Sequence, residues 1–132
     1  MIPSNIKLHR RRRTLELEYS VNGATSTFEV SAECLRVHSP SAEVRGHGKG
    51  QAVLQIGKRD VGLLSIEAAG NYGLRLTFDD THDSGIFTWE YLHKLANEQE
   101  RLMLDYERQL HQAGESRDDG VQVVNIMPSK PH

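Results

Sequence analysis

Cysteine is almost absent from this chain, because Cys34 is the only one among 132 residues. A single cysteine excludes an internal disulfide and any zinc or iron–sulfur site built from several thiolates of one chain. Long apolar runs are also lacking, since no stretch approaches the ~20 residues that a membrane-spanning helix needs. No signal-peptide core stands near the N-terminus. We therefore expect no membrane segment and a cytoplasmic location.

An excess of charge of one sign is missing as well. Lysine and arginine number 16 against 18 aspartates and glutamates, which gives a formal net charge of −2 at pH 7. This balance gives no general attraction to nucleic acid or to anionic lipid. Hydrophobic residues make up 37% and charged residues 26% of the chain, close to the globular average. One folded domain with its own core is expected.

The chain up to about residue 78 alternates between polar and apolar residues with the period of two that β-strands require. Thr14–Tyr19 and Thr25–Val30 both alternate, and Asn22-Gly23 between them favours a two-residue hairpin turn. The pattern predicts further strands over three later stretches, Val53–Ile56, Val61–Ala68 and Tyr72–Phe78.

A short helical turn and a loop are expected after the hairpin. Ser31 is a typical N-cap for a turn over 32–36. Pro40 disfavours helical backbone at the preceding residue, so Val37–Val44 should be loop or extended chain. The glycine-rich stretch 45–51 favours an irregular loop.

From Thr88 the apolar spacing changes to the three- and four-residue steps of an amphipathic helix. Thr88 suits the N-cap and Gly114 follows the last apolar turn, so a helix is expected to end near residue 113. The predicted fold class is α+β, a mainly antiparallel β-sheet with a short helix and a long C-terminal amphipathic helix. Residues 1–113 then form a single domain, and 114–132 form a flexible tail.

The densest charge cluster is the basic run His9–Arg13, which contains four consecutive arginines. Such a run can neutralise phosphates. No aromatic residue is interleaved with it for base stacking, however. The run also stands between two strand-like segments, where exposed cations deter edge pairing. We favour a structural or solvated role and do not expect a nucleic-acid partner.

The stretch Asp79–Asp83 places three carboxylates and His82 within five positions. Carboxylates this close raise one another's pKa unless a cation lies among them. Oxygen and imidazole ligands together suit divalent iron, manganese or zinc. The structural alternative is that aspartates end strands and cap helices. No nucleophile motif accompanies the cluster, and Cys34 stands in a partly apolar turn, where we expect a packed rather than a reactive thiol.

Four segments in this order resemble the gamma-butyrobetaine hydroxylase-like N-terminal domain family. They are Leu35–Val44, Gly46–Gly48, Gly70–Tyr72 and Phe78–Trp89. The resemblance covers about residues 3–95. In the hydroxylases of that name, the domain precedes a 2-oxoglutarate- and iron-dependent oxygenase domain. There it binds a structural zinc through three cysteines and one histidine.

Carried over by position, the three zinc-binding cysteines fall on Ser39, Ser41 and Val44, and the histidine falls on His82. The resemblance therefore implies that a tetrahedral thiolate zinc site cannot form here. We also expect no oxygenase domain, because almost no chain follows the match. A similar domain is appended to P-loop scaffold proteins that transfer iron–sulfur clusters, which implies a role in iron handling.

Our leading hypothesis is a non-enzymatic binding or accessory module. It would hold a divalent metal, iron or zinc, or a protein partner in a pocket built from His82, Asp80, Asp79, His47 and His38. The resemblance implies that this partner is related to iron–sulfur proteins or to oxygenases.

The alternative is an interaction or assembly role for the long helix, without metal. Its apolar positions extend beyond what a small sheet covers, which would favour a homodimer through residues 88–113. An enzymatic role, with Asp80 and His82 as an acid–base pair, ranks last, because nothing in the sequence places them in one cleft.

Overall fold

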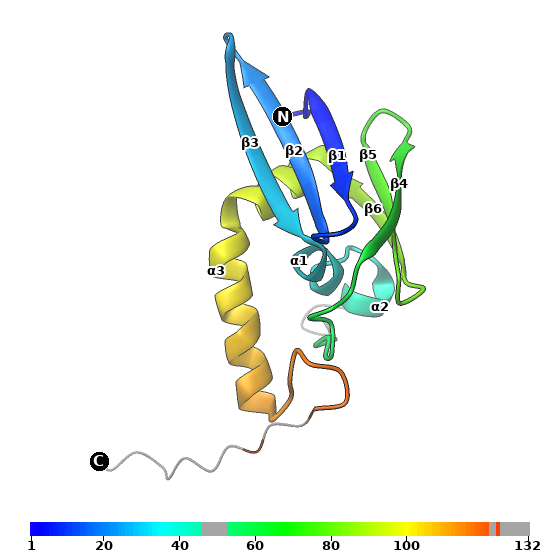
Figure 1. The fold of residues 1–132 in the computed structure, drawn as a ribbon, viewed down its shortest axis with the longest axis vertical. Coiled ribbons are helices and arrows are strands. Elements are labelled where there is room, and N and C mark those ends of the chain that lie inside the picture. The colour runs from blue at the N-terminus through cyan, green and yellow to red at the C-terminus, as the bar shows by residue number, and fades with distance from the viewer. Residues whose placement is uncertain (46–52, 122–123, 125–132) are drawn as a thin grey trace, which may run out of the picture.

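The structure is a computed structural model, and it describes residues 1–45, 53–121 and 124. Figure 1 shows two antiparallel sheets, two short helices and a long helix that descends from the sheets. The α+β class with a short helix and a long C-terminal helix is thus confirmed. The strands divide into two three-stranded sheets, which local periodicity cannot reveal because it does not identify the neighbour of a strand.

The first sheet consists of β1 (Asn5–His9), β2 (Thr14–Val21) and β3 (Ala24–Ser31). Asn22 and Gly23 have φ angles of 52° and 80°, as a hairpin turn that follows the right-handed twist of its strands requires. The predicted hairpin is confirmed. Leu15, Leu17 and Tyr19 of β2 are buried, so this face of the sheet forms part of the core.

The second sheet consists of β4 (Leu63–Ala69), β5 (Gly73–Phe78) and β6 (Asp83–Thr88). β6 pairs with β5 in a stretch for which the sequence pattern predicts no strand. Val53–Ile56 is the opposite case, because it alternates like a strand but forms none. A strand needs a partner in a sheet as well as a suitable pattern, and only the tertiary fold supplies one.

Two short helices follow the first sheet, α1 (Ala32–Val37) and α2 (Ala42–Arg45). The expected turn is confirmed, since α1 begins at Ser31, whose hydroxyl accepts a hydrogen bond from the amide of Cys34 at 3.0 Å. The prediction of a loop up to residue 44 is wrong in its last part, where α2 forms. Pro40 lies ahead of the first turn of α2, where a missing N–H group does no harm.

The long helix α3 (Trp89–Ala113) has both predicted ends. The Thr88 hydroxyl accepts a hydrogen bond from the amide of Tyr91 at 3.2 Å, and Gly114 ends the helix in the left-handed conformation with a φ of 69°. No helix in the described part of the chain is both long enough and apolar enough to cross a membrane.

The core has two parts, and each covers one half of α3. The larger part joins both sheets and α1 to Leu92, Leu95 and Ala96 of the first half of α3. The smaller part joins Val37 of α1 to Tyr106 and Leu110 of the second half, with Leu54 packed against them. The apolar stripe that suggested a helix-mediated homodimer is therefore largely covered within the chain. Leu104, by contrast, is 59% exposed.

Residues 115–119 fold back beside the loop that precedes β4. The backbone amides of Gly57 and Arg59 donate to carbonyls of this segment at 2.9 and 2.8 Å. The Arg117 guanidinium donates to both carboxylate oxygens of the buried Glu33 at 2.7 and 2.6 Å. The stretch expected to be a flexible tail therefore begins with a segment that is tied to the domain, and most of its remaining residues lie outside the described ranges.

Candidate functional site

The residues selected from the sequence lie at two places in the described structure. Asp79, Asp80 and His82 lie at the turn between β5 and β6, and His38 follows the last residue of α1. His47 lies outside the described residues. The surroundings of each residue decide what it can bind.

His82 is 5% exposed and forms a buried serine–histidine cluster with Ser39 and Ser41. Its Nε2 atom lies 3.1 Å from Ser39 Oγ and 3.2 Å from Ser41 Oγ. Both distances are those of ordinary hydrogen bonds. The serines belong to the loop between α1 and α2, so the cluster joins that loop to the turn between β5 and β6.

The serine–histidine cluster occupies the positions to which the family resemblance carries two zinc-binding cysteines and the histidine. The residues present do not fit zinc. Serine hydroxyls lack the thiolate charge of the missing ligands, and the remaining position, Val44, is a buried hydrocarbon side chain. The imidazole already has hydrogen-bonding partners in the two hydroxyls. Hydrogen bonds thus take the place of metal bonds at this point of the fold.

Asp80 is held by two cations. Its Oδ2 atom accepts hydrogen bonds from Arg36 Nε at 2.9 Å and from Lys58 Nζ at 2.6 Å. Burial alone would raise the pKa of Asp80, but the hydrogen bonds from Lys58 and Arg36 and their positive charges lower it overall. The carboxylate cluster needs a counter-charge, and the chain itself provides it through two residues that the sequence pattern did not single out.

The contacts of Asp80 and His82 are linked through the backbone, while Asp79 lies apart. The amide of His82 donates to Asp80 Oδ1 at 3.3 Å. Asp79 is exposed, and its amide donates to the carbonyl of Gly62 at 2.9 Å. Asp80 and His82 therefore come close together, but their side chains are engaged by different partners.

His38 is a half-buried imidazole with a defined tautomer. Its Nδ1 atom lies 2.8 Å from the carbonyl oxygen of Cys34. Because a carbonyl oxygen only accepts hydrogen bonds, Nδ1 must carry the proton and Nε2 is left as an acceptor. Burial lowers the pKa of His38, so the ring is neutral at pH 7. Cys34 is packed as expected, since burial raises the pKa of its thiol to about 12.

A second histidine cluster lies on the outer face of the first sheet, where no single sequence motif indicates it. His9, Glu16 and Glu29 come from three neighbouring strands, and their ligand atoms all lie within 4.8 Å of one another. Glu29 is paired with Arg12, whose Nε and a terminal nitrogen donate to its two carboxylate oxygens at 2.9 Å each. The guanidinium therefore occupies the place of an added cation. The signal for this surface cluster is the strand register, which places Glu16 opposite Glu29.

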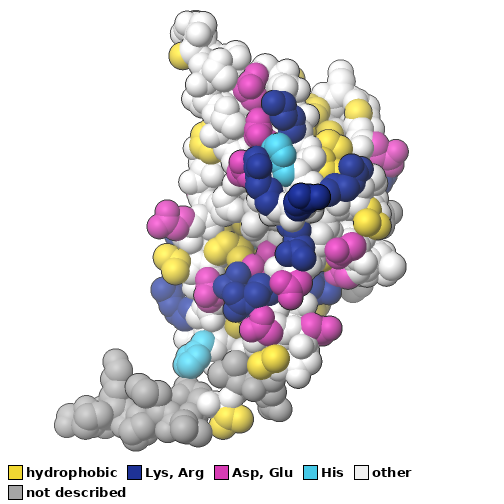
Figure 2. All heavy atoms as spheres, in the orientation of Figure 1, with side chains coloured by type: hydrophobic (Ala, Val, Ile, Leu, Met, Phe, Trp, Pro, Cys, Tyr) yellow, Lys and Arg dark blue, Asp and Glu magenta, His cyan; other side chains and the backbone are white. Residues whose placement is uncertain are grey.

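The arginine run forms the turn between β1 and β2, and two of its side chains bind within the molecule. Arg10 donates twice to the carbonyl of Leu64 in β4, at 3.1 and 3.0 Å, and Arg12 pairs with Glu29. Figure 2 shows several Lys and Arg side chains gathered beside a histidine on this side of the molecule, with Asp and Glu side chains close by. These contacts agree with the expected structural role.

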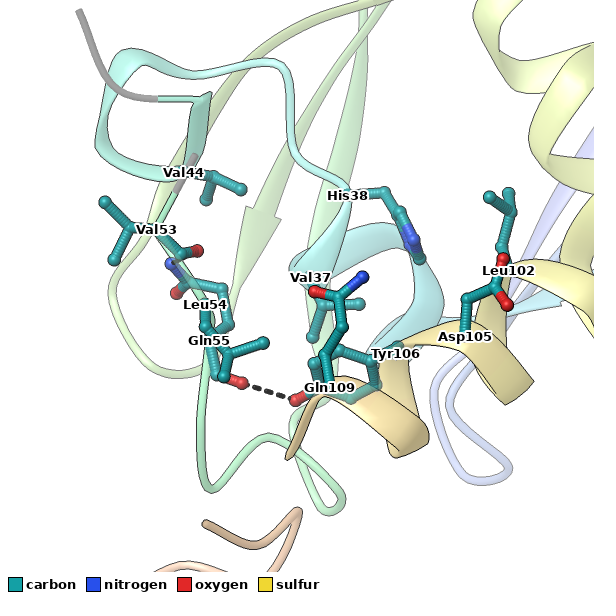
Figure 3. Close-up of a pocket in the computed structure, with 10 residues that line it drawn as sticks. All are labelled: Val37, His38, Val44, Val53, Leu54, Gln55, Leu102, Asp105, Tyr106 and Gln109. Atoms are coloured by element: carbon teal, nitrogen blue, oxygen red, sulfur yellow. Dashed lines mark hydrogen bonds between the residues drawn. The ribbon is translucent and has the colours of Figure 1, made fainter. Parts of the chain in front are cut away.

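A groove of about 320 Å³ lies between the second half of α3, the end of α1 and residues 53–55 (Figure 3). This volume is at the lower end of the range for ligand sites. The apolar lining residues are Val37, Val44, Val53, Leu54 and Leu102, and the polar ones are His38, Gln55, Asp105, Tyr106 and Gln109. The groove was not predicted from the sequence, because the stretches that form it are far apart along the chain.

Most polar groups of the groove already have partners within the chain. The Tyr106 hydroxyl donates to the carbonyl of Gln55 at 2.6 Å, the contact that Figure 3 marks with a dashed line. Asp105 pairs with two arginines of α3. The acceptor atom Nε2 of His38 has no such contact within the described residues. The Gln109 carboxamide also lines the groove. A partly apolar groove with a neutral imidazole acceptor in its wall is suited to a ligand that presents a hydrocarbon group and a hydrogen-bond donor.

Comparison with known families identifies the fold. The model of the family described as gamma-butyrobetaine hydroxylase-like, N-terminal, matches residues 6–93. The chain belongs to this family. The match includes both sheets, α1, α2 and the first residues of α3, and so contains the serine–histidine cluster and Asp80. A search of curated proteins gives no match.

Solved structures of similar sequence have a similar fold. An NMR structure with 51% identity has a TM-score of 0.81 and covers 96% of this chain and 98% of its own. A second NMR structure, with 40% identity and a TM-score of 0.73, covers 99% and 92%. A crystal structure from Acidithiobacillus ferrooxidans, of a protein with unknown function in the DUF971 family, is 33% identical. Its TM-score is 0.51, and it covers 71% of this chain and 91% of its own.

Proposed function

We propose that this domain is a non-enzymatic binding module and that a protein partner docks in the groove between α3 and residues 53–55. The observation that carries the proposal is the state of His38. Its Nδ1–H group donates to the Cys34 carbonyl, so Nε2 is left as a neutral acceptor in the wall of a groove that is lined in part by apolar side chains. A partner segment would place an apolar side chain in the groove and donate a hydrogen bond to His38 Nε2.

The size and charge of the groove restrict the partner. A volume of about 320 Å³ suits one or two side chains of a peptide better than a large cofactor. Asp105, the one charged side chain of the lining, is paired with Arg101 and Arg108, so the groove offers no free charge for a charged segment to pair with. We therefore expect a neutral, apolar segment. We also expect that the protein is cytoplasmic and that its partner is related to iron–sulfur proteins or to oxygenases.

Site-specific cross-linking tests the docking site. A photo-reactive amino acid replaces Gln109 at the groove, and the full chain is irradiated in cells that express it. Val53→Asp should abolish a discrete adduct, whereas Leu64→Asp should not, although both native side chains are 52% exposed. Mass spectrometry should place the cross-link in an apolar segment of the partner. An adduct that survives Val53→Asp, or no adduct at all, would rule out the groove.

A metal-binding version of the module uses the residues selected from the sequence and would act in iron or iron–sulfur handling. It is the weaker candidate, because a divalent ion at Asp80 would be repelled by Arg36 and Lys58, which are already bonded to that carboxylate. Calorimetric titration with Fe²⁺ and Zn²⁺ tests it on the wild type and on an Asp80→Ala, His82→Ala double variant. Heat that is absent, or equal in both proteins, would eliminate this version.

Assembly through α3 is the remaining candidate from the sequence. It would need apolar surface on residues 88–113, and the buried Leu92, Leu95, Tyr106 and Leu110 do not provide it. Light scattering over a concentration series tests this candidate. A strict monomer at high concentration would exclude it.

A further inference from the structure

A separate pocket, which we call the side pocket, lies beside the first turns of α3. Its volume is about 410 Å³, and its lining comes from the loop after α1, the end of α2, the second half of β6 and the start of α3. It shares no lining residue with the groove. The volume is within the range of small-molecule sites, so the nature of the lining decides which molecule the side pocket suits.

Two cations from different elements line the side pocket. Arg45 is the last residue of α2, and Lys94 lies in the second turn of α3. Neither side chain forms an ion pair with a carboxylate among the residues that the structure describes. Glu90 is the one acidic residue of the lining, so two cations and one carboxylate leave one positive charge. The side pocket therefore favours an anion of low charge over a cation.

The Arg45 guanidinium is held in place by an aromatic ring. Its Cζ atom lies 5.2 Å from the centroid of the Tyr91 ring, which is the arrangement of a cation–π contact. The Tyr91 hydroxyl donates to the carbonyl of His38 at 2.6 Å, and the ring stacks on Phe87 with a centroid distance of 5.9 Å. The ring is thus fixed by its hydroxyl and by its face. A guanidinium positioned in this way can donate two parallel hydrogen bonds to a carboxylate.

Part of the lining of the side pocket is apolar. Pro40 and Ile86 line it together with the Tyr91 ring, and both are only partly buried, so some of their hydrocarbon surface is accessible. An inorganic anion would leave this surface uncovered, and a dianion would exceed the one positive charge. A carboxylate attached to a short apolar body matches both features, because the body would remove the hydrocarbon surface from water.

We infer that the side pocket binds a small organic monocarboxylate. The carboxylate would lie between Arg45 and Lys94, and the apolar body would lie against the Tyr91 ring. This site is separate from the groove and does not depend on the proposed function. Both cations are exposed, so water competes for them and the affinity is expected to be modest. Selectivity then comes from the combination of one negative charge with an apolar body.

Titration of the full chain with sodium benzoate, followed by ¹H–¹⁵N NMR, tests this inference. Benzoate replaces chloride at constant ionic strength, so general salt effects stay equal. We expect saturable shifts of the amide signals of Ile86, Thr88 and Tyr91. Benzamide, which has nearly the same shape without the charge, should bind several-fold more weakly. Absent or non-saturating shifts with benzoate, or equal binding of the two compounds, would overturn the inference.

Matched variants assign the binding to the two cations. Arg45→Gln and Lys94→Gln should each weaken benzoate binding several-fold, whereas Lys94→Arg keeps the charge and should retain most of the affinity. Arg11→Gln is the control, because it removes the same charge from an exposed side chain that does not line the side pocket. Unchanged binding in Arg45→Gln or Lys94→Gln would place benzoate elsewhere and overturn the inference. Equal weakening in Arg11→Gln would show a response to net charge alone and would overturn it as well.

Discussion

The buried serine–histidine cluster and the surface cluster of His9, Glu16 and Glu29 each bring a histidine close to groups that ligate metals. In the buried cluster, two neutral hydroxyls lie 3.1 and 3.2 Å from Nε2 of His82. In the surface cluster, Nε2 of His9 lies 2.8 Å from a carboxylate oxygen of Glu16, and an arginine holds the neighbouring Glu29.

The difference between the clusters follows from their exposure. A buried imidazole can be satisfied by hydroxyls without any net charge, which avoids the large cost of burying an unpaired ion. Carboxylates at the surface keep their charge in water, and nearby cations balance it at little gain in stability. Suitable residue types therefore do not make a metal site where internal donors or cations already fill the positions around them.

Placing cysteines at the positions of the family's zinc ligands should cause the largest change in metal binding and stability. The triple variant Ser39→Cys, Ser41→Cys and Val44→Cys should bind zinc together with His82, whereas the wild type should not. Structural zinc sites contribute about 10–16 kcal/mol in small domains, so a chelator should sharply lower the unfolding temperature of the variant only. Metal analysis and thermal unfolding with and without EDTA measure this. A folded triple variant without zinc would show that the geometry, as well as the ligands, has changed.

Removing the carboxylate of Asp80 and, in a second variant, that of Glu29 compares the contribution of a buried ion pair to stability with that of an exposed one. Asp80→Ala leaves Arg36, whose side chain is 8% exposed, without its carboxylate, and we expect a loss of about 2–4 kcal/mol in the free energy of unfolding. Glu29→Ala at the surface cluster should shift the urea midpoint far less. Urea denaturation followed by circular dichroism compares the two variants. Equal losses would mean that Asp80 contributes no more than a surface carboxylate.

A smaller change in stability is expected from removing single buried hydroxyl groups, and the hydroxyls of Ser39 and Tyr19 can be compared for this purpose. Ser39→Ala removes a partner of His82 and should destabilise the domain by about 1–2 kcal/mol. The Tyr19 hydroxyl is buried without a partner in the described structure, so Tyr19→Phe should stabilise by up to about 1 kcal/mol. If urea denaturation shows that Ser39→Ala lowers the free energy of unfolding and Tyr19→Phe raises it, the result supports the hydrogen-bonded role of the cluster. A change of the free energy of unfolding in the same direction for both variants would contradict that role.

Acidification should have the smallest effect, and it concerns the third histidine environment. Because burial lowers the pKa of His38, the unfolded chain binds its proton more readily than the folded one. The stability from neutral His38 is therefore complete above its ordinary value of 6.5 and decreases as the pH falls below it. His38→Asn should flatten the dependence of the urea midpoint between pH 7.5 and 5.5. An unchanged slope would assign the dependence to other groups.

Several elements could be predicted because their signals are local. The Asn22-Gly23 turn, the Ser31 cap and the two ends of α3 each depend on contacts over a few residues. The strand β6 was missed because its partner β5 supplies the pairing, and Val53–Ile56 was wrongly assigned because it has no partner. The alternation of polar and apolar residues indicates which face of a strand a side chain lies on. It does not indicate whether another strand is present to pair with it.

The candidate site shows the same division. The sequence indicated Asp80 and His82, but Arg36 lies 44 positions from Asp80, and Ser39 lies 43 positions from His82. The groove likewise joins residues near 38, 54 and 106 that no spacing rule relates.

The sequence by itself determined the α+β class, the hairpin, the short and long helices and the packed state of Cys34. These depend on periodicity, caps and apolar character, which act over one or two turns of chain. Only the tertiary structure decided which donor or cation satisfies each polar side chain and where a groove is left open. The physical reason is that hydrogen bonds and ion pairs act over about 3 Å, and only folding brings distant side chains within that distance.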